Sequence, residues 1–284
     1  MTQKLNWAWF DESLGEGYRL GLEIEQTLHE SGSIGLYETA RFGRVLALDG
    51  VIQTTTRDEF IYHEMLAHVP IIAHGAVARV CIVGGGDGGS LREVLKHDVA
   101  ATLVEIDGSV IELCKTHLPD LSAGAFDDPR AEIVIADGAA FMGRDGPSFD
   151  IIIVDSTDPI GPGAALFTKA FTTACRDRLA PGGILVTQNG VPFVQGAELK
   201  RSLGHFRALF ADAACYLAPV PTYFGGFMAF GWATDDPATR HLGQDEIAAR
   251  FERARIETRY YTPAVHKAAF ALPGYVRELV DGAD

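Results

Sequence analysis

The chain has 284 residues and a formal net charge of −14, and 47% of its residues are hydrophobic. An acidic chain lacks the basic patches that nucleic acid and anionic membranes require, so we expect neither as a partner. The charge is compatible with a cationic substrate, and equally with an ordinary acidic surface. The length allows one large domain with a smaller attachment, and the hydrophobic fraction is enough for a buried core.

Cysteine spacing limits the possible metal and redox chemistry. The four cysteines, Cys81, Cys114, Cys175 and Cys215, lie far apart and form no CxxC or Cys/His pattern. This pattern excludes a zinc signature and a disulfide framework, and it predicts buried free thiols. The N-terminus has no apolar signal core, and no stretch approaches the ~18 apolar residues of a membrane span. We therefore expect a soluble, cytoplasmic protein that holds no metal.

The first elements in chain order are short strands. Hydrophobic and polar residues alternate with period two in three short runs, and Asp49-Gly50 marks a turn after the third. Alternation with Asp-Gly turns predicts antiparallel strands. We expect a small β domain over residues 1–57 and a main domain over residues 58–284. The alternating runs cover residues 18–24, 35–39 and 44–48.

The pattern changes at residue 58. Apolar positions at helical spacing predict a helix over residues 58–73. Continuous apolar runs then recur, separated by helical patterns or loops, and such runs are typical of strands buried on both faces of a mostly parallel sheet. The sequence therefore predicts an α/β main domain. The predicted strands cover residues 80–83, 103–106, 133–135, 151–154 and 184–187, with two late strands near 213–219 and 226–233.

A glycine loop follows the first of these strands. Gly84-x-Gly86-x-x-Gly89 fits the dinucleotide fingerprint, and Glu105 supplies the acid about 20 residues on that accepts from a ribose diol. NAD(P) and S-adenosyl ligands both carry that ribose. Asp87 would repel a pyrophosphate by about 1–4 kcal/mol, whereas it would attract an ammonium or a sulfonium. We therefore favour an S-adenosyl-type ligand. Asp87 also fits a helix-capping role, which is compatible with ligand binding.

Another acid follows a later strand, in Asp137-Gly138. At this edge of an α/β sheet an aspartate can accept from an adenine amino group. Asp-Gly is also ordinary turn chemistry. Spacing alone leaves both interpretations open.

Asp155 and Asp158 are the strongest catalytic candidates. They follow the predicted strand 151–154 in a loop rich in proline and glycine. In a doubly wound sheet they should converge with Asp87 and Glu105 on one cleft. Carboxylates so close together need a neutralising cation, which either a metal or an amine substrate could supply. A magnesium site would lack an evident phosphate partner, and we find no Ser/His/Asp nucleophile arrangement.

Aromatic hydroxyls and a histidine flank these acids in the sequence. Tyr62 and His63 are polar residues in the semi-apolar helix 58–73, and Tyr223 lies in a loop before a late strand. Taken alone, His63 fits a satisfied interior or surface histidine as well as a ligand contact.

Several long motifs together resemble the polyamine aminopropyltransferase family, and within it bacterial spermidine synthases. The resemblance runs in order from about residue 5 to residue 280. It implies a Rossmann-like methyltransferase-type domain behind a small N-terminal antiparallel β domain, in a homodimer or homotetramer. It implies transfer of an aminopropyl group from decarboxylated S-adenosylmethionine to putrescine, giving spermidine and 5′-methylthioadenosine. The donor is a co-substrate, so no cofactor is implied. The motifs are LDGVIQT, RDEFIYHEM, GGGDGGSLREVLKH, VEID, DSTDPIGP, PTYFGG and YYTPAVHKAAFALP.

The resemblance also implies roles for individual residues. Asp155 takes the position of the catalytic base, and with Asp87 it would hold the donor's aminopropyl ammonium. Glu105 would bind the ribose. The remaining donor-binding positions are Gly84, Gly86, Asp137, Gly138 and Pro162, and those around the diamine are Tyr62, His63, Asp158 and Tyr223.

Two positions depart from the family pattern. Gly32 stands where the family usually has a donor-contacting glutamine, in a hairpin that looks shortened, and Thr56 replaces a usual glutamate. Other activities on this scaffold stay open: transfer to cadaverine, agmatine or spermidine, N-methylation of a diamine, or binding of polyamines or nucleosides without catalysis.

Overall fold

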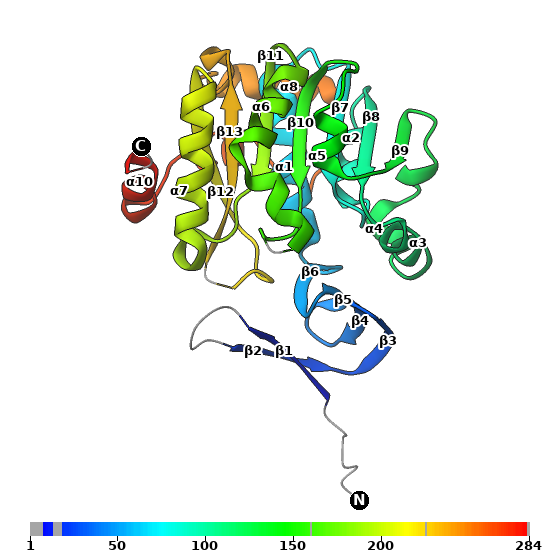
Figure 1. Cartoon of the computed structure of the whole chain (residues 1–284). Coiled ribbons are helices and arrows are strands. Elements are labelled where there is room, and N and C mark those ends of the chain that lie inside the picture. The colour runs from blue at the N-terminus through cyan, green and yellow to red at the C-terminus, as the bar shows by residue number, and fades with distance from the viewer. Residues whose placement is uncertain (1–7, 14–18, 160, 225, 283–284) are drawn as a thin grey trace, which may run out of the picture.

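Two small antiparallel sheets form the N-terminal part of the chain. The structure is a computed structural model that describes residues 8–13, 19–159, 161–224 and 226–282 (Figure 1). Asp49 and Gly50 both have positive φ and form a two-residue hairpin turn, as the Asp-Gly pair predicts. One sheet pairs β1 (Ala8–Ser13) with β2 (Arg19–Ile24); the other has the order β3 (Gln26–Ser31), β4 (Ile34–Thr39), β5 (Gly43–Leu48), β6 (Val51–Thr55).

The main domain contains a seven-stranded sheet in the order β12-β13-β11-β10-β7-β8-β9. The strands from β11 to β9 pair in parallel, whereas β13 pairs antiparallel with β11 and with β12. This confirms the mostly parallel α/β sheet that the apolar runs predict. The strands are β7 (Arg79–Gly84), β8 (Ala100–Glu105), β9 (Ala131–Ile135), β10 (Phe149–Asp155), β11 (Leu179–Gln188), β12 (Asp212–Pro219) and β13 (Phe227–Thr234).

Helices cover both faces of the sheet (Figure 1). One buried cluster joins the sheet to α1, α2, α8 and α9, and another joins it to α5, α6, α7 and α10. Within the described residues, no helix is long and apolar enough to cross a membrane. The helices are α1 (Glu59–His74), α2 (Gly89–Leu95), α3 (Gly108–His117), α4 (Pro119–Ser122), α5 (Gly138–Met142), α6 (Lys169–Arg178), α7 (Pro192–Leu209), α8 (Gln244–Ala254), α9 (Pro263–Ala269) and α10 (Gly274–Asp281), with 3-10 turns η1 (Ala125–Asp127), η2 (Gly161–Phe167) and η3 (Pro237–Thr239).

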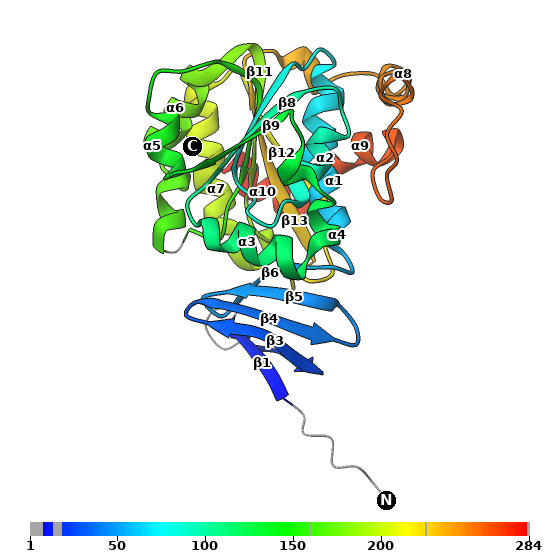
Figure 2. The ribbon, with the colours of Figure 1, turned by 90° about the vertical axis from the view of Figure 1, so that its right-hand side faces the viewer.

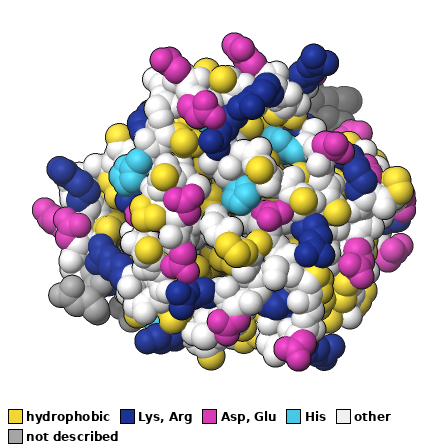
Figure 3. All heavy atoms as spheres, turned by 90° about the horizontal axis from the view of Figure 1, so that it is seen from above, with side chains coloured by type: hydrophobic (Ala, Val, Ile, Leu, Met, Phe, Trp, Pro, Cys, Tyr) yellow, Lys and Arg dark blue, Asp and Glu magenta, His cyan; other side chains and the backbone are white. Residues whose placement is uncertain are grey.

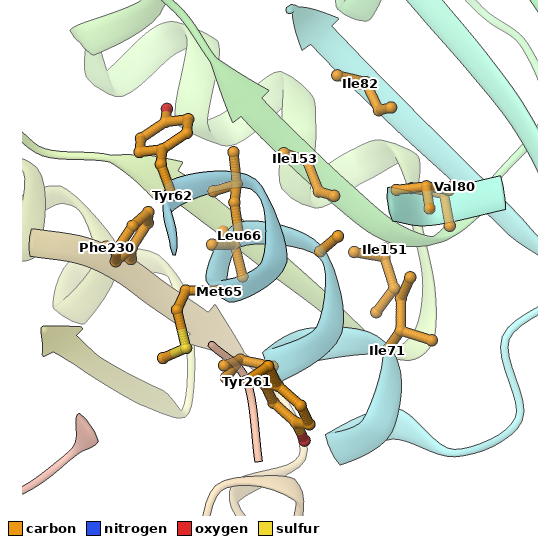
Figure 4. Close-up of a cluster of buried hydrophobic side chains, with 14 of the residues drawn as sticks. Tyr62, Met65, Leu66, Ile71, Val80, Ile82, Ile151, Ile153, Phe230 and Tyr261 are labelled. Atoms are coloured by element: carbon orange, nitrogen blue, oxygen red, sulfur yellow. The ribbon is translucent and has the colours of Figure 1, made fainter. Parts of the chain in front are cut away.

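Helix α1 is buried along almost its whole length. Figure 4 shows its side chains Met65 and Leu66 in one cluster with Ile151 and Ile153 of β10. Glu64 faces the C-terminal segment, where its buried carboxylate accepts the backbone N–H groups of residues 259–261 at 2.7–2.8 Å. The helix that carries Tyr62 and His63 is therefore fixed on both sides.

A third apolar cluster joins the small sheets to the main domain. Leu36 of β4 and Leu46 of β5 pack with Leu113 and Cys114 of α3, which lies above the small sheets in Figure 2. All four cysteines are buried free thiols, as their spacing predicts. The opposite end of the molecule carries acidic and basic side chains interspersed (Figure 3).

Replacement of Ile153 by alanine should test how strongly the sheet core stabilises the fold. Ile153 is fully buried on β10, so the change should lower the free energy of unfolding by about 2–5 kcal/mol. The control is Ile135→Ala on β9, where the side chain is 56% exposed and the expected change is within ~0.5 kcal/mol. Urea unfolding measures both. Equal losses would contradict this account of the core.

Candidate active site

A cavity of about 810 Å³ lies where the carboxyl ends of the parallel strands face the small sheets. Every predicted site residue whose side chain is described lines it. The side chain of Pro162 lies outside the described residues. The lining positions predicted from sequence are Tyr62, His63, Gly84, Gly86, Asp87, Glu105, Asp137, Gly138, Asp155, Asp158 and Tyr223.

The glycine loop lies directly against two acids. Gly84 has φ +86°, and a Cβ there would overlap the Asp155 carbonyl oxygen. The Gly85 N–H donates to that oxygen at 2.8 Å. A Cβ at Gly86 would lie 2.9 Å from Glu105 Oε2. The loop therefore needs glycine so that its backbone can approach both Asp155 and Glu105.

Asp155 ends β10 with both carboxylate oxygens occupied. The Tyr62 hydroxyl donates to Oδ1 at 2.7 Å, and the Ser90 hydroxyl donates to Oδ2 at 2.5 Å. Burial raises the pKa of the Asp155 carboxyl above its ordinary value, and the Asp87 charge adds to the rise. The positive charge of His63 and the two hydroxyl donors oppose it without cancelling it.

The environment of Asp87 lowers the pKa of its carboxyl, whereas that of Asp155 raises it. Burial acts to raise its pKa, but His63 and the Gly89 N–H hold the pKa below the ordinary value. His63 Nε2 lies 3.5 Å from Asp87 Oδ2, and His63 Nδ1 lies 2.6 Å from Glu59 Oε2. Burial lowers the pKa of His63, but these two acids raise it well above its usual range. The Gly89 N–H donates to Asp87 at 2.9 Å, although the N-cap position of α2 is Gly88 and not Asp87.

The far end of the cavity carries a second group of acids. Two amide groups donate to Asp158: Gln195 Nε2 to Oδ2 at 2.9 Å and Gln188 Nε2 to Oδ1 at 3.5 Å. Glu12, on β1, lines the same cavity and accepts the Ile52 N–H at 3.1 Å. Burial, with a smaller contribution from Asp158, raises the pKa of Glu12 to about 7.

Two aromatic side chains, Tyr62 and Tyr223, line the same cavity. The Tyr223 hydroxyl donates to the Gln53 carbonyl at 2.5 Å. Its ring meets the Tyr62 ring edge to face, with the centroids 5.8 Å apart. These contacts give the middle of the cavity an apolar wall, as an alkyl chain would require.

Glu105 and Asp137, the remaining acids predicted to bind the donor, also line the cavity. Glu105 accepts the Asp107 N–H at 2.9 Å, and burial raises its pKa. Asp137 caps α5 by accepting the Ala140 N–H at 2.8 Å. Asp137 is therefore a helix N-cap, and Gly138 is the first residue of α5 and not part of a turn. The place of Asp137 on the cavity wall leaves the adenine role as a prediction.

The two departures from the family pattern lie in the small sheets. Gly32 occupies the turn between β3 and β4 with φ +58°, and its neighbour Ser33 lines the cavity. Thr56 accepts the Arg44 N–H at 3.0 Å. Their effects on substrate binding stay predictions.

Within the described part of the chain, His63, Asp87 and Asp155 are the group that could offer three ligand atoms to a metal, all within 4.8 Å of one another. Each ring nitrogen of His63 already faces a carboxylate. A ring protonated on both nitrogens, as its two acidic neighbours favour, has no lone pair for a metal. The arrangement therefore fits a hydrogen-bonded histidine better than a ligand.

Sequence reasoning missed several residues of the site. Ser90, Gln188 and Gln195 contact the predicted aspartates, and Glu12 lines the cavity from the first strand. Gln188 ends β11, so its place at the carboxyl edge of the sheet was the one available signal.

Comparison with known families settles the class of protein. A model described as the spermine/spermidine synthase domain matches residues 59–242, and one described as the spermidine synthase tetramerisation domain matches residues 8–56. The chain belongs to the spermine/spermidine synthase family. This confirms the resemblance found in the sequence motifs.

Individual relatives agree with the family assignment. Polyamine aminopropyltransferase of Ruegeria sp. (strain TM1040) is 52% identical over 278 residues, covering 96% of this chain and 98% of that protein. Polyamine aminopropyltransferase 1 of Pseudomonas aeruginosa is 52% identical over 281 residues, covering 97% of this chain and 98% of that protein. The family member described here is therefore an enzyme of the polyamine aminopropyltransferase type.

Solved structures confirm the fold. A spermidine synthase in complex with the transition-state analogue AdoDATO superposes with a TM-score of 0.92 at 38% identity, covering 99% of this chain and 98% of that one. Spermidine synthase from Thermotoga maritima superposes with a TM-score of 0.89 at 37% identity, again covering 99% of this chain and 98% of that one. The Rossmann-like main domain with a small N-terminal β part is thus a shared architecture.

Tyr62→Phe should raise the pKa of Asp155 further. Burial already raises it, and the Tyr62 hydroxyl is one of the groups that hold it down. Carbon-13 NMR titration of the aspartate carboxyls measures the change. Tyr216→Phe is the matched control because that buried hydroxyl donates to the Met65 carbonyl instead. An Asp155 pKa that stays constant or falls in Tyr62→Phe contradicts this account.

Proposed function

We propose that this enzyme transfers the 3-aminopropyl group of decarboxylated S-adenosylmethionine to putrescine, releasing 5′-methylthioadenosine and forming spermidine, with Asp155 as general base. The observation that carries the proposal is the opposite displacement of two neighbouring acids. The pKa of Asp155 is raised and that of Asp87 is lowered. The acid with the raised pKa is suited to accept a proton, and the acid with the lowered pKa stays an anion.

The donor fits the glycine-loop side of the cavity. Glu105 would accept from the ribose hydroxyls, and Asp137 with Gly138 would take the adenine. Asp87 would then face the end of the donor's propyl chain. Decarboxylated donor carries only an ammonium there, whereas ordinary S-adenosylmethionine adds a carboxylate that an anionic Asp87 repels. The loop thus selects the decarboxylated form.

The reaction is an in-line displacement at the propyl carbon attached to sulfur. The acceptor nitrogen forms the new C–N bond, the C–S bond breaks, and its electron pair leaves with a neutral thioether. The nitrogen must first lose a proton, which Asp155 accepts. An aliphatic ammonium near pKa ~10 and an ordinary aspartate near ~4 are poorly matched, so the raised pKa of Asp155 narrows that gap.

The second ammonium of the diamine fits the far end of the cavity. Asp158, held by its two glutamine donors, and Glu12 line that end. The spacing between this end and Asp155 would then set the acceptor length. The match of residues 8–56 to a tetramerisation domain supports a homo-oligomer, either homodimer or homotetramer. The cytoplasmic location and the lack of a cofactor stay predictions.

Asp155→Asn should lower kcat by about 10²–10⁴-fold, because the amide cannot accept the acceptor's proton. The KM of the donor should change little if Asp87 holds its ammonium. Initial rates of 5′-methylthioadenosine release measure both. Asp145→Asn, at an exposed position, is the control. Turnover in Asp155→Asn equal to wild type would remove Asp155 as the base.

Mass analysis of the products from a panel of diamines tests the acceptor. Putrescine should give the aminopropyl product fastest. A faster reaction with cadaverine, agmatine or spermidine would reassign the acceptor. A product heavier by one methyl group, made from ordinary S-adenosylmethionine, would instead indicate a diamine N-methyltransferase.

The KM for putrescine should fall as pH rises through about 7, the pKa to which burial and Asp158 raise Glu12. Glu12 is neutral below that pH and becomes an anion above it, and only the anion attracts the distal ammonium. Glu12→Gln should remove this pH dependence and raise KM at pH 8 by about ten-fold.

Glu198 is the matched control for that experiment. Burial and Asp158 raise its pKa to about 7 as well, yet it is not among the cavity-lining residues. Glu198→Gln should keep the pH dependence. If Glu198→Gln abolishes it and Glu12→Gln does not, the distal site has been assigned to the wrong acid.

A further inference from the structure

A buried chain of alternating charges runs from the active site into the packing between α1 and α2. It begins at Asp87 and passes through His63 to Glu59. Arg92 donates two hydrogen bonds to the Glu59 carboxylate, at 2.8 and 3.2 Å. Arg92 Nε donates to Glu93 at 2.8 Å. The proposed chemistry uses only the Asp87 end, so the function of the remainder is unassigned.

The ring of His63 is held in one orientation. It is 2% exposed, and its edge faces the Tyr62 ring with the centroids 5.3 Å apart. A Cβ at Gly89 would overlap the ring, so α2 begins in van der Waals contact with it. The ring therefore cannot turn away from its two acidic neighbours without moving α2.

The two ring nitrogens of His63 both face carboxylate oxygens, Glu59 on one side and Asp87 on the other. A neutral imidazole has one N–H, so it would set a lone pair against one of the two carboxylates. The imidazolium instead turns an N–H toward each carboxylate, at 2.6 Å from Glu59 and 3.5 Å from Asp87.

Arg92 fixes the acid on the outer side of this ring. Its guanidinium engages both oxygens of Glu59, and it also donates to the Leu121 carbonyl at 2.5 Å. A two-point contact of this kind sets the orientation of a carboxylate as well as its charge. Glu59 is thus held as an anion aimed at His63 Nδ1.

We propose that Glu59 and Arg92 are positioning residues of the donor site, which hold the His63 imidazolium against Asp87 so that Asp87 stays an anion for the donor's primary ammonium. This assignment rests on the proposed function of the cavity. Neither residue needs to touch a substrate.

The charged groups that face His63 come from four elements. Glu59 comes from α1, Asp87 from the loop after β7, Asp155 from β10, and Arg92 of α2 acts through Glu59. Without the imidazolium, Asp87 and Asp155 would be two buried acids competing for one proton. The pair Glu59 and Arg92 therefore keeps the proton-accepting role on Asp155.

Glu59→Gln tests the proposal through equilibrium binding of decarboxylated S-adenosylmethionine, measured by calorimetry across pH. The Kd at pH 7 should rise by about ten-fold, because His63 loses the acid that keeps it charged and the Asp87 pKa then rises. The loss should shrink as pH increases and Asp87 ionises. Arg92→Lys keeps the charge without the two-point contact, and should change Kd in the same direction by less.

Glu64→Gln is the matched control. Glu64 is an equally buried acid on the same helix, but it accepts backbone N–H groups of the C-terminal segment. The Glu64→Gln change should lower the melting temperature of the enzyme without changing the pH dependence of donor binding. If Glu59→Gln behaves as Glu64→Gln does, Glu59 is purely structural and the proposal is overturned.

Nitrogen-15 NMR of histidine in the unmodified enzyme gives a readout that does not depend on activity. The His63 signal, assigned by its loss in His63→Gln, should show two protonated nitrogens at pH 8. A neutral tautomer at pH 8 would overturn the proposal. Failure of the wild type to bind the donor, with His63 still protonated, would instead count against the proposed function.

Discussion

Parallel pairing between β7 and β10 sets Asp155 opposite Gly84 at the carboxyl edge of the sheet. The strands lie so close there that a side chain at Gly84 would overlap the Asp155 backbone. The glycine loop and Asp155, the proposed general base, are therefore one structural unit. Asp87 follows in the same loop, and α2, which begins directly after it, packs on the ring of His63. The other polar contacts of the site are built around this pairing.

Burial acts to raise the pKa of Asp87, Asp155 and Glu12 alike, and the partners of each carboxylate decide the outcome. Asp87 has His63 beside it, which holds the pKa of this carboxyl below the ordinary value. Asp155 has two hydroxyl donors and a neighbouring acid, so its pKa stays raised. Glu12 has a single backbone N–H, and its pKa reaches about 7. The carboxyl groups with raised pKa, Asp155 and Glu12, therefore hold protons more readily until cations bind in the cavity. The cationic substrates proposed for this cavity would favour ionisation of these acids, and ionised acids would in turn bind the cations more strongly.

Continuous apolar runs were sufficient to predict the parallel strands, because buried strands need apolar residues on both faces. The glycine loop and the acids at strand ends could be placed together for the same topological reason. Glu12 could not be found, since its position depends on how the small sheets pack on the main domain. Gln195 was missed because it lies at a non-helical residue inside α7. No sequence pattern predicts such an irregularity. Glu59 and His63 lie four residues apart in the predicted helix 58–73, a spacing that places side chains together, but the sequence analysis did not use it.

The place of Asp155 on a central strand has a consequence for motion. The residues just before it, Ile151 to Val154, are at most 2% exposed and lie between two paired strands. Their amides should exchange with solvent only through unfolding of the whole sheet. Asp158 lies beyond the strand end, and two glutamine side chains hold its carboxylate. Local opening around Asp158 would break only a few hydrogen bonds, so this part of the cavity should open more readily than the strand that carries Asp155.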